Sequence, residues 1–110
     1  MEHEQIWTEL VRKAQKGRKE DVNKLAREAK ERLCAYIYRV TLNYDLTEDM
    51  SQEVLLQMFK SLHHLKSVES FWPWLYRIAQ STVQQHYRDK QRRLASADSA
   101  FYEDFISRRT

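Results

Sequence analysis

The chain holds only one glycine and one proline in 110 residues, so it has almost none of the residues that end helices or shape tight turns. Apolar residues recur at every third or fourth position over long stretches, which is the spacing of one face of a helix. The apolar–polar alternation that is typical of strands is hard to find. The sequence therefore predicts an all-α fold, a compact bundle of about four helices.

Four stretches carry the helical spacing, and their predicted ranges are 5–16, 20–43, 47 to between 62 and 65, and 70–93. Gly17 predicts the end of the first helix, because glycine readily adopts the left-handed conformation of a C-terminal cap. Thr47 and Ser70 are the predicted N-caps of the third and fourth helices. The polar segment between these two helices, residues 63–70, is predicted to be a loop.

The length fits one domain, which we assign to residues 1–93. Residues 94–110 lose the apolar period and are predicted to be a linker or tail. Within that tail, residues 101–106 are expected to make a short helical contact.

Charge is distributed unevenly along the chain, although the net charge is only +3. Residues 45–59 carry four acids and no base, whereas residues 77–93 carry five bases and one acid. An acidic helix fits a basic protein partner, and a basic helix fits a phosphate backbone. The aromatic segment 71–76 precedes the basic stretch, and its rings suit stacking on unpaired bases.

Several classes of function find no support in the sequence. Cys34 is the only cysteine, which excludes an internal disulfide. His63 and His64 are adjacent, point in different directions on a helix end and have no third ligand nearby, so no metal site is expected. No glycine-rich phosphate loop or nucleophile motif is present, so we expect neither an enzyme nor a cofactor. No apolar run approaches a membrane span or a signal region, which predicts a cytoplasmic protein.

Two motifs stand in order, Asp49-Met-Ser-Gln-Glu53 and Phe71-Trp-Pro-Trp-Leu-Tyr-Arg-Ile-Ala79, with Leu10-Val-Arg-Lys-Ala-Gln-Lys-Gly17 upstream. In this order and spacing the chain resembles region 2 of bacterial RNA polymerase sigma factors, the extracytoplasmic-function type in particular. The resemblance covers about residues 8–93. It implies a non-enzymatic transcription initiation domain that binds core RNA polymerase and that recognises and melts the −10 promoter element.

The resemblance also implies roles for individual residues and partners. The third helix would bind the β′ clamp helices of core polymerase through Asp49, Gln52, Glu53, Leu56 and Gln57. The 63–70 loop and the fourth helix would bind −10 DNA, single-stranded once melted, through His64, Lys66, Ser67, Trp72, Tyr76, Arg77, Gln80, Ser81, Gln84, Arg88, Arg92 and Arg93. An anti-sigma factor is a further candidate partner.

The sequence departs from the family pattern at two places. Gln80-Ser81 stands where the family often has an asparagine, which leaves the −10 base preference open. Family members normally carry a second, helix-turn-helix domain that reads the −35 element, and the stretch after Arg93 is too short to hold one, so that domain is expected to be absent.

The aromatic segment distinguishes the promoter-binding interpretation from an alternative one. In the alternative, the chain is a helical protein-interaction module in transcription regulation without DNA contact. Trp74 and Leu75 lie on the apolar stripe and are predicted to be core. Trp72 and Tyr76 lie off it and are the candidates for exposed stacking. An interaction module would bury the whole segment, whereas a promoter-binding domain would leave part of it beside a basic groove.

Overall fold

The computed structural model describes the backbone of residues 2–109 and the side chains of residues 5–108. Within that range it contains no strand, which confirms the all-α prediction. The elements are α1 (Glu2–Gln15), α2 (Lys19–Thr41), α3 (Tyr44–Ser61), the 3₁₀ turns η1 (Leu62–His64) and η2 (Val68–Ser70), and α4 (Phe71–Arg109).

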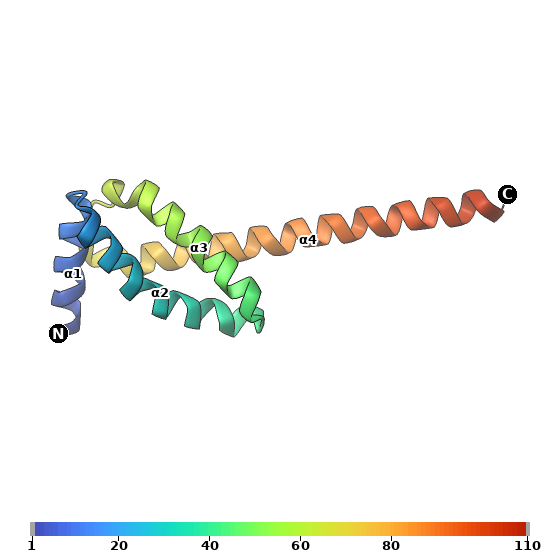
Figure 1. Ribbon diagram of the computed structural model, residues 1–110. Coiled ribbons are helices and arrows are strands. Elements are labelled where there is room, and N and C mark those ends of the chain that lie inside the picture. Colours follow the sequence, from blue (N-terminus) through green and yellow to red (C-terminus); the bar gives the residue numbers. More distant parts are fainter. Residues whose placement is uncertain (1, 110) are drawn as a thin grey trace.

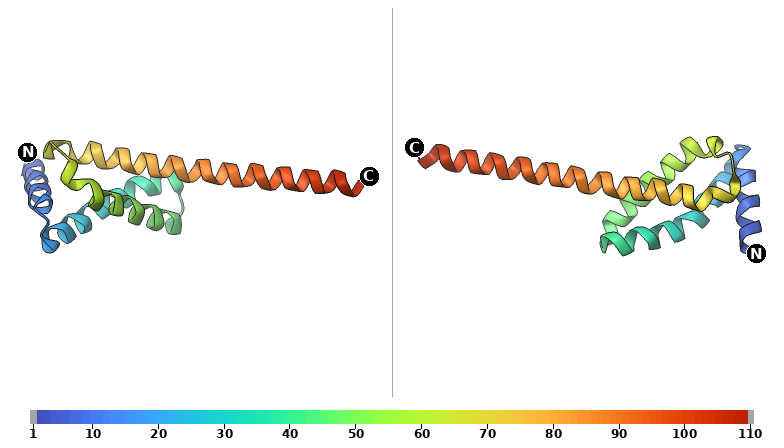
Figure 2. Two further views of the ribbon diagram at one scale, coloured as in Figure 1. Left: turned by 90° about the horizontal axis from the view of Figure 1, so that it is seen from above. Right: turned by 180° about the vertical axis from the view of Figure 1, so that it is seen from behind.

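The first three helices gather around the first half of α4, and the second half of α4 extends away from them (Figures 1 and 2). The molecule is therefore elongated and measures 70 × 25 × 21 Å along its principal axes. A compact bundle is a correct description of the part of the chain up to about residue 87. The rest of α4 continues beyond the bundle as a single exposed helix.

The fourth helix runs past its predicted end near Arg93 and continues to Arg109. After Pro73 there is neither glycine nor proline, and arginine, glutamine, leucine and alanine favour the helix, so nothing in the backbone stops it. The loss of the apolar period therefore marks the end of packing and not the end of the helix, because all side chains of residues 88–108 are exposed. Phe101 is 73% exposed and does not make the contact with the core that was expected of it. A linker role for this segment stays a prediction.

The core lies between α1, α2, α3 and the first half of α4, and it confirms the predicted apolar stripe of the third helix and most of that of the fourth, where Trp74, Ile78 and His86 are only half-buried. On α3 the predicted inward residues are buried, namely Met50, Val54, Leu55 and Met58, with Leu62 just beyond the helix. On α4 the buried members of the stripe are Phe71, Leu75, Ala79, Thr82 and Val83.

The helix ends confirm one predicted cap and correct another. Gly17 has a positive φ of 87° and ends α1 as predicted. The N-cap of α3 is Asn43, whose side chain accepts a hydrogen bond from the Leu46 amide at 3.0 Å. The predicted cap, Thr47, is instead buried inside the helix, where its hydroxyl donates to the Asn43 carbonyl at 2.8 Å. Ser70 is the last residue of the η2 turn, which runs directly into α4.

Polar contacts also join α3 to α2. The Cys34 thiol donates to the Ser51 hydroxyl at 3.2 Å. Lys30 forms an ion pair with Glu48 at 3.3 Å. These groups lie on the α2-facing side of α3, so the opposite side of α3 faces solvent.

Candidate functional site

The five residues predicted to bind polymerase share the solvent-exposed side of α3. Positions 49, 52, 53 and 56 recur at three- and four-residue intervals, and residue 57 lies at the edge of this face. The structure thus brings together, all exposed, Asp49, Gln52, Glu53, Leu56 and Gln57. Leu56 is 57% exposed, so an apolar side chain lies among the acidic and amide groups.

The exposed side of α3 carries fewer acids than the four that the sequence contains between residues 45 and 59. Glu48 turns toward α2 and pairs with Lys30, so the acids that remain on the exposed face are Asp45, Asp49 and Glu53. Phe59, which the sequence did not single out, is 38% exposed and lies three residues after Leu56. We call this surface, Asp45 to Phe59 on the exposed side of α3, the acidic face.

On α4, most of the residues predicted to bind DNA form one exposed row. Their spacing of three or four residues places them along a single side of the helix, opposite Leu75 and Ala79. We define this basic row as Arg77, Gln80, Ser81, Gln84, Arg88 and Arg92, all of which are exposed. Arg93 is also exposed but lies off the row.

The loop before α4 supplies the remaining predicted DNA contacts. His64, Lys66 and Ser67 are all exposed. The Ser67 hydroxyl donates to Glu69 at 2.9 Å. Hydrogen bonds from the Glu69 backbone N–H and the Ser67 hydroxyl lower the pKa of Glu69, with a smaller contribution from Arg12. The loop therefore carries a stable negative charge next to its cations.

Gln15, which the sequence did not single out, holds this loop to α1. Its side-chain amide donates to the Leu62 carbonyl at 3.1 Å and to the Leu65 carbonyl at 2.7 Å. These partners are about fifty residues away in the chain. No local sequence pattern can reveal such a contact, because it exists only once α1 packs beside the loop.

Replacing Gln15 with alanine is expected to loosen the loop while the helices remain folded. Two loop carbonyls lose their donor, at about 0.5–1.5 kcal/mol each. Amide hydrogen exchange should therefore become faster in residues 62–70. Gln5→Ala, at an exposed position of the same helix, is the matched control and should leave the exchange unchanged. Identical exchange in the two variants would show that Gln15 does not hold the loop.

The aromatic segment is less open than predicted. Trp72 is half-buried, and its ring lies 4.7 Å from that of Trp7, between ring centroids, and 4.9 Å from the Arg32 guanidinium. Tyr76 is half-buried too, with its ring 5.0 Å from that of Tyr36. Both rings are thus less exposed than predicted, because α1 and α2 cover part of this side of α4, which the pattern of α4 alone cannot show. Their stacking on DNA bases stays a prediction.

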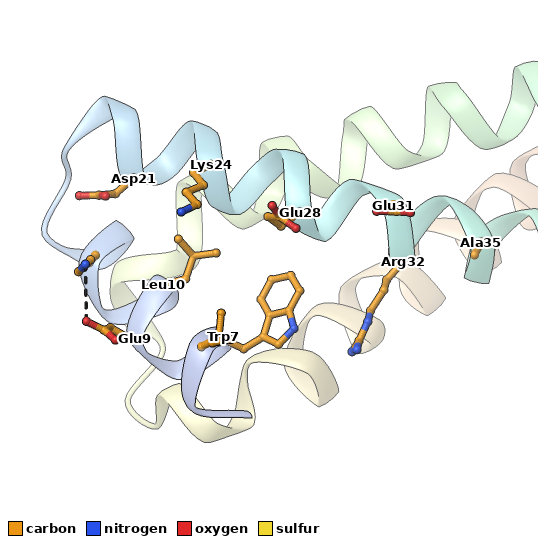
Figure 3. Close-up of a pocket in the computed structure, with 11 residues that line it drawn as sticks. Trp7, Glu9, Leu10, Asp21, Lys24, Glu28, Glu31, Arg32 and Ala35 are labelled. Carbon is orange, nitrogen blue, oxygen red and sulfur yellow. Dashed lines mark ion pairs between the residues drawn. The ribbon is translucent and has the colours of Figure 1, made fainter. Parts of the chain in front are cut away.

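A groove of about 710 Å³ opens between α1 and α2 beside these rings. Figure 3 shows Trp7 and Arg32 pointing toward one another in it, at 5.7 Å from guanidinium carbon to ring centroid. The charged residues of its walls are Glu9, Lys13, Asp21, Lys24, Glu28, Glu31 and Arg32. Acids and bases nearly balance, so the groove does not extend the basic row.

The described part of the chain shows neither a metal-binding cluster nor a membrane-spanning helix. Among its residues, no group of three or more His, Cys, Asp and Glu side chains is placed to hold a metal ion. None of its helices combines the length and apolar character needed to cross a bilayer.

Comparison with curated proteins finds bacterial sigma factors. The chain is 26% identical over 100 residues to an RNA polymerase sigma-H factor of Pseudomonas aeruginosa, covering 86% of this chain and 52% of that protein. It is 28% identical over 89 residues to an ECF RNA polymerase sigma-E factor of Escherichia coli, covering 81% and 46%. The chain thus spans about half the length of these relatives. No solved structure matches it significantly.

The family comparison agrees with the motifs and with the helical architecture. Residues 25–93 match the family described as Sigma-70 region 2. This range includes α3 with its acidic face, the loop, and α4 as far as the basic row extends. Because the match covers more than half of its length, the chain belongs to the sigma-70 region 2 family.

Proposed function

We propose that this domain acts in transcription initiation in the cytoplasm by binding core RNA polymerase through the acidic face and −10 promoter DNA through the loop and the basic row. One observation carries the proposal: the two charged groups occupy exposed sides of two helices that pack against each other. One domain can therefore contact a basic protein surface and a phosphate backbone at the same time.

The acidic face suits the β′ clamp helices of the polymerase if those present basic side chains. Asp49 and Glu53 are one helical turn apart and exposed, so both carboxylates can accept charge-assisted hydrogen bonds from the same partner surface. Leu56, one turn further, adds apolar contact between the charged groups.

The basic row suits a DNA strand that leaves the loop and follows α4. Its arginines would neutralise phosphates, while Gln80, Ser81 and Gln84 offer donors and acceptors without charge. At the start of the row, the loop presents His64, Lys66 and Ser67 to the solvent. A single strand held there would expose its base edges to the protein. Promoter melting would then draw only on binding energy and would need no catalysis.

We expect the domain to bind a single-stranded −10-type oligonucleotide more tightly than the same sequence as a duplex, and less tightly as salt rises. Arg88→Ala and Arg92→Ala should each reduce the slope of log affinity against log salt by about 0.7, one phosphate contact on a single strand. Gln84→Ala should lower the affinity and leave the slope unchanged. Fluorescence anisotropy across a salt series measures both quantities.

Arg39→Ala is the matched control for this experiment, because Arg39 is an exposed arginine of α2 outside the basic row. Its salt slope should equal that of the unchanged protein. Equal binding of single strand and duplex, with no effect of the row variants, would contradict DNA binding. That result would favour the alternative, a protein-interaction module. The half-burial of Trp72 and Tyr76 is compatible with such a module.

A further inference from the structure

The loop that the proposed function assigns to DNA has little regular structure of its own. It is built from the two short turns η1 and η2 and from residues 65–67 between them. Short 3₁₀ turns have poorer hydrogen-bond geometry than an α-helix, so contacts from other elements decide how rigid this segment is. The predicted DNA contacts His64, Lys66 and Ser67 lie in or beside residues 65–67. Their positions therefore depend on what holds the centre of the loop.

Gln15 provides such an anchor from α1. The shorter of its two hydrogen bonds, at 2.7 Å, goes to the Leu65 carbonyl. Leu65 lies between His64 and Lys66, two of the residues predicted to bind DNA. A peptide unit is planar, so holding the Leu65 carbonyl also fixes the amide of Lys66 and the direction in which the chain continues. Gln15 therefore sets the backbone geometry at the centre of the predicted contacts.

The packing beside the start of the loop is open, which makes this anchor more important. A cleft of about 420 Å³ is lined by Leu62 and His63 from the loop and by Val22 and Asn23 from α2. Side chains beside an open cleft have fewer neighbours to hold them than side chains in a closed core. Gln15 lines the same cleft and donates to the Leu62 carbonyl at 3.1 Å. Its two hydrogen bonds thus tie the loop to α1 where close packing does not.

We propose that Gln15 is a positioning residue for DNA binding, which holds the loop in the conformation that contacts the −10 strand and does not itself touch DNA. The inference rests on the proposed function. Gln15 lies outside residues 25–93, so this role is not part of the region that matches the family. The apparent affinity of a protein falls with the fraction of molecules in the binding conformation, so a loosened loop binds more weakly.

Gln15→Met tests the proposal, because methionine has a similar size and helix preference but no N–H donor. The affinity of the full chain for a single-stranded −10-type oligonucleotide should fall about fivefold or more, measured by fluorescence anisotropy. Gln15→Lys should retain the affinity, because an ammonium group can donate to both carbonyls. Gln5→Lys adds the same charge at an exposed position of α1 and is its matched control. The two lysine variants should agree within about twofold.

A double-mutant cycle separates positioning from a general loss of structure, with helicity checked by circular dichroism. If Gln15 acts through the loop, Gln15→Met should have a clearly smaller effect in a chain that already carries Lys66→Ala than in the unchanged chain. It should keep its full effect beside Arg88→Ala, because Arg88 lies on α4 well beyond the loop. Equal effects in the two backgrounds would overturn the positioning role.

The outcomes distinguish this inference from the proposed function on which it rests. If the unchanged protein binds the oligonucleotide and Gln15→Met binds it equally well, the positioning role is wrong and DNA binding stands. Equal weakening by Gln15→Met and Gln15→Lys would show that the hydrogen-bond donors are not what holds the loop, and would also overturn it. If the unchanged protein does not bind, the proposed function is contradicted and the positioning role is rejected with it.

Discussion

Replacing Leu75 with alanine is expected to lower the free energy of unfolding by about 2–5 kcal/mol. Leu75 is fully buried, on the side of α4 that faces the rest of the core, so the truncation leaves a cavity. A domain of this size has only about 5–15 kcal/mol of stability, so the loss is a large fraction of the total. Urea titration followed by circular dichroism measures it.

Leu56→Ala is the matched control for this truncation. It removes the same side chain from a site that is 57% exposed, and its effect should stay within about 0.5 kcal/mol. Ile78, which the sequence placed on the same stripe as Leu75, is half-buried and should cost less than Leu75 when truncated. A loss below about 1 kcal/mol for Leu75→Ala would mean that this side of α4 does not carry the core.

Replacing Asp49 and Glu53 together with alanine is expected to weaken binding to core RNA polymerase at least about tenfold, or ~1.4 kcal/mol. Both carboxylates are exposed on the acidic face, and the contacts of α3 with α2 are made by other residues. Alanine also favours a helix, so the fold should be retained. Titration of the polymerase with labelled protein measures the affinity.

The control for polymerase binding removes the same charge elsewhere. Glu28 and Glu31 are exposed acids of α2, outside the acidic face, and their double replacement with alanine should leave the affinity close to that of the unchanged protein. Equal weakening by both pairs would indicate a general effect of net charge. Unchanged binding of the Asp49 and Glu53 variant, with its helicity intact, would contradict the docking proposal.

The spacing of residues along one helix was enough to predict which of its sides is buried. Met50, Val54 and Met58 had to share a side of α3, and burying them turned Asp49 and Glu53 outward. The same reasoning aligned the basic row on α4. These features depend on a period of 3.6 residues and on the removal of apolar surface from water, both of which are local properties of the chain.

The contacts between different helices were decided only by the tertiary structure. Asn43 rather than Thr47 caps α3, because Thr47 lies under α2, where its hydroxyl is 2.8 Å from that of Thr41. Trp72 is half-buried because α1 brings Trp7 against it. Gln15 reaches the loop only because α1 packs beside it.

The second half of α4 shows the division most clearly. The sequence determined that residues 94–109 have no place in the core of the bundle, since their apolar period is lost. Whether these residues form a flexible tail or a helix depended on the first half of α4, whose helical turns are fixed by packing in the core. Once a helix is nucleated, each added residue gains a backbone hydrogen bond, and no glycine or proline interrupts it before Arg109.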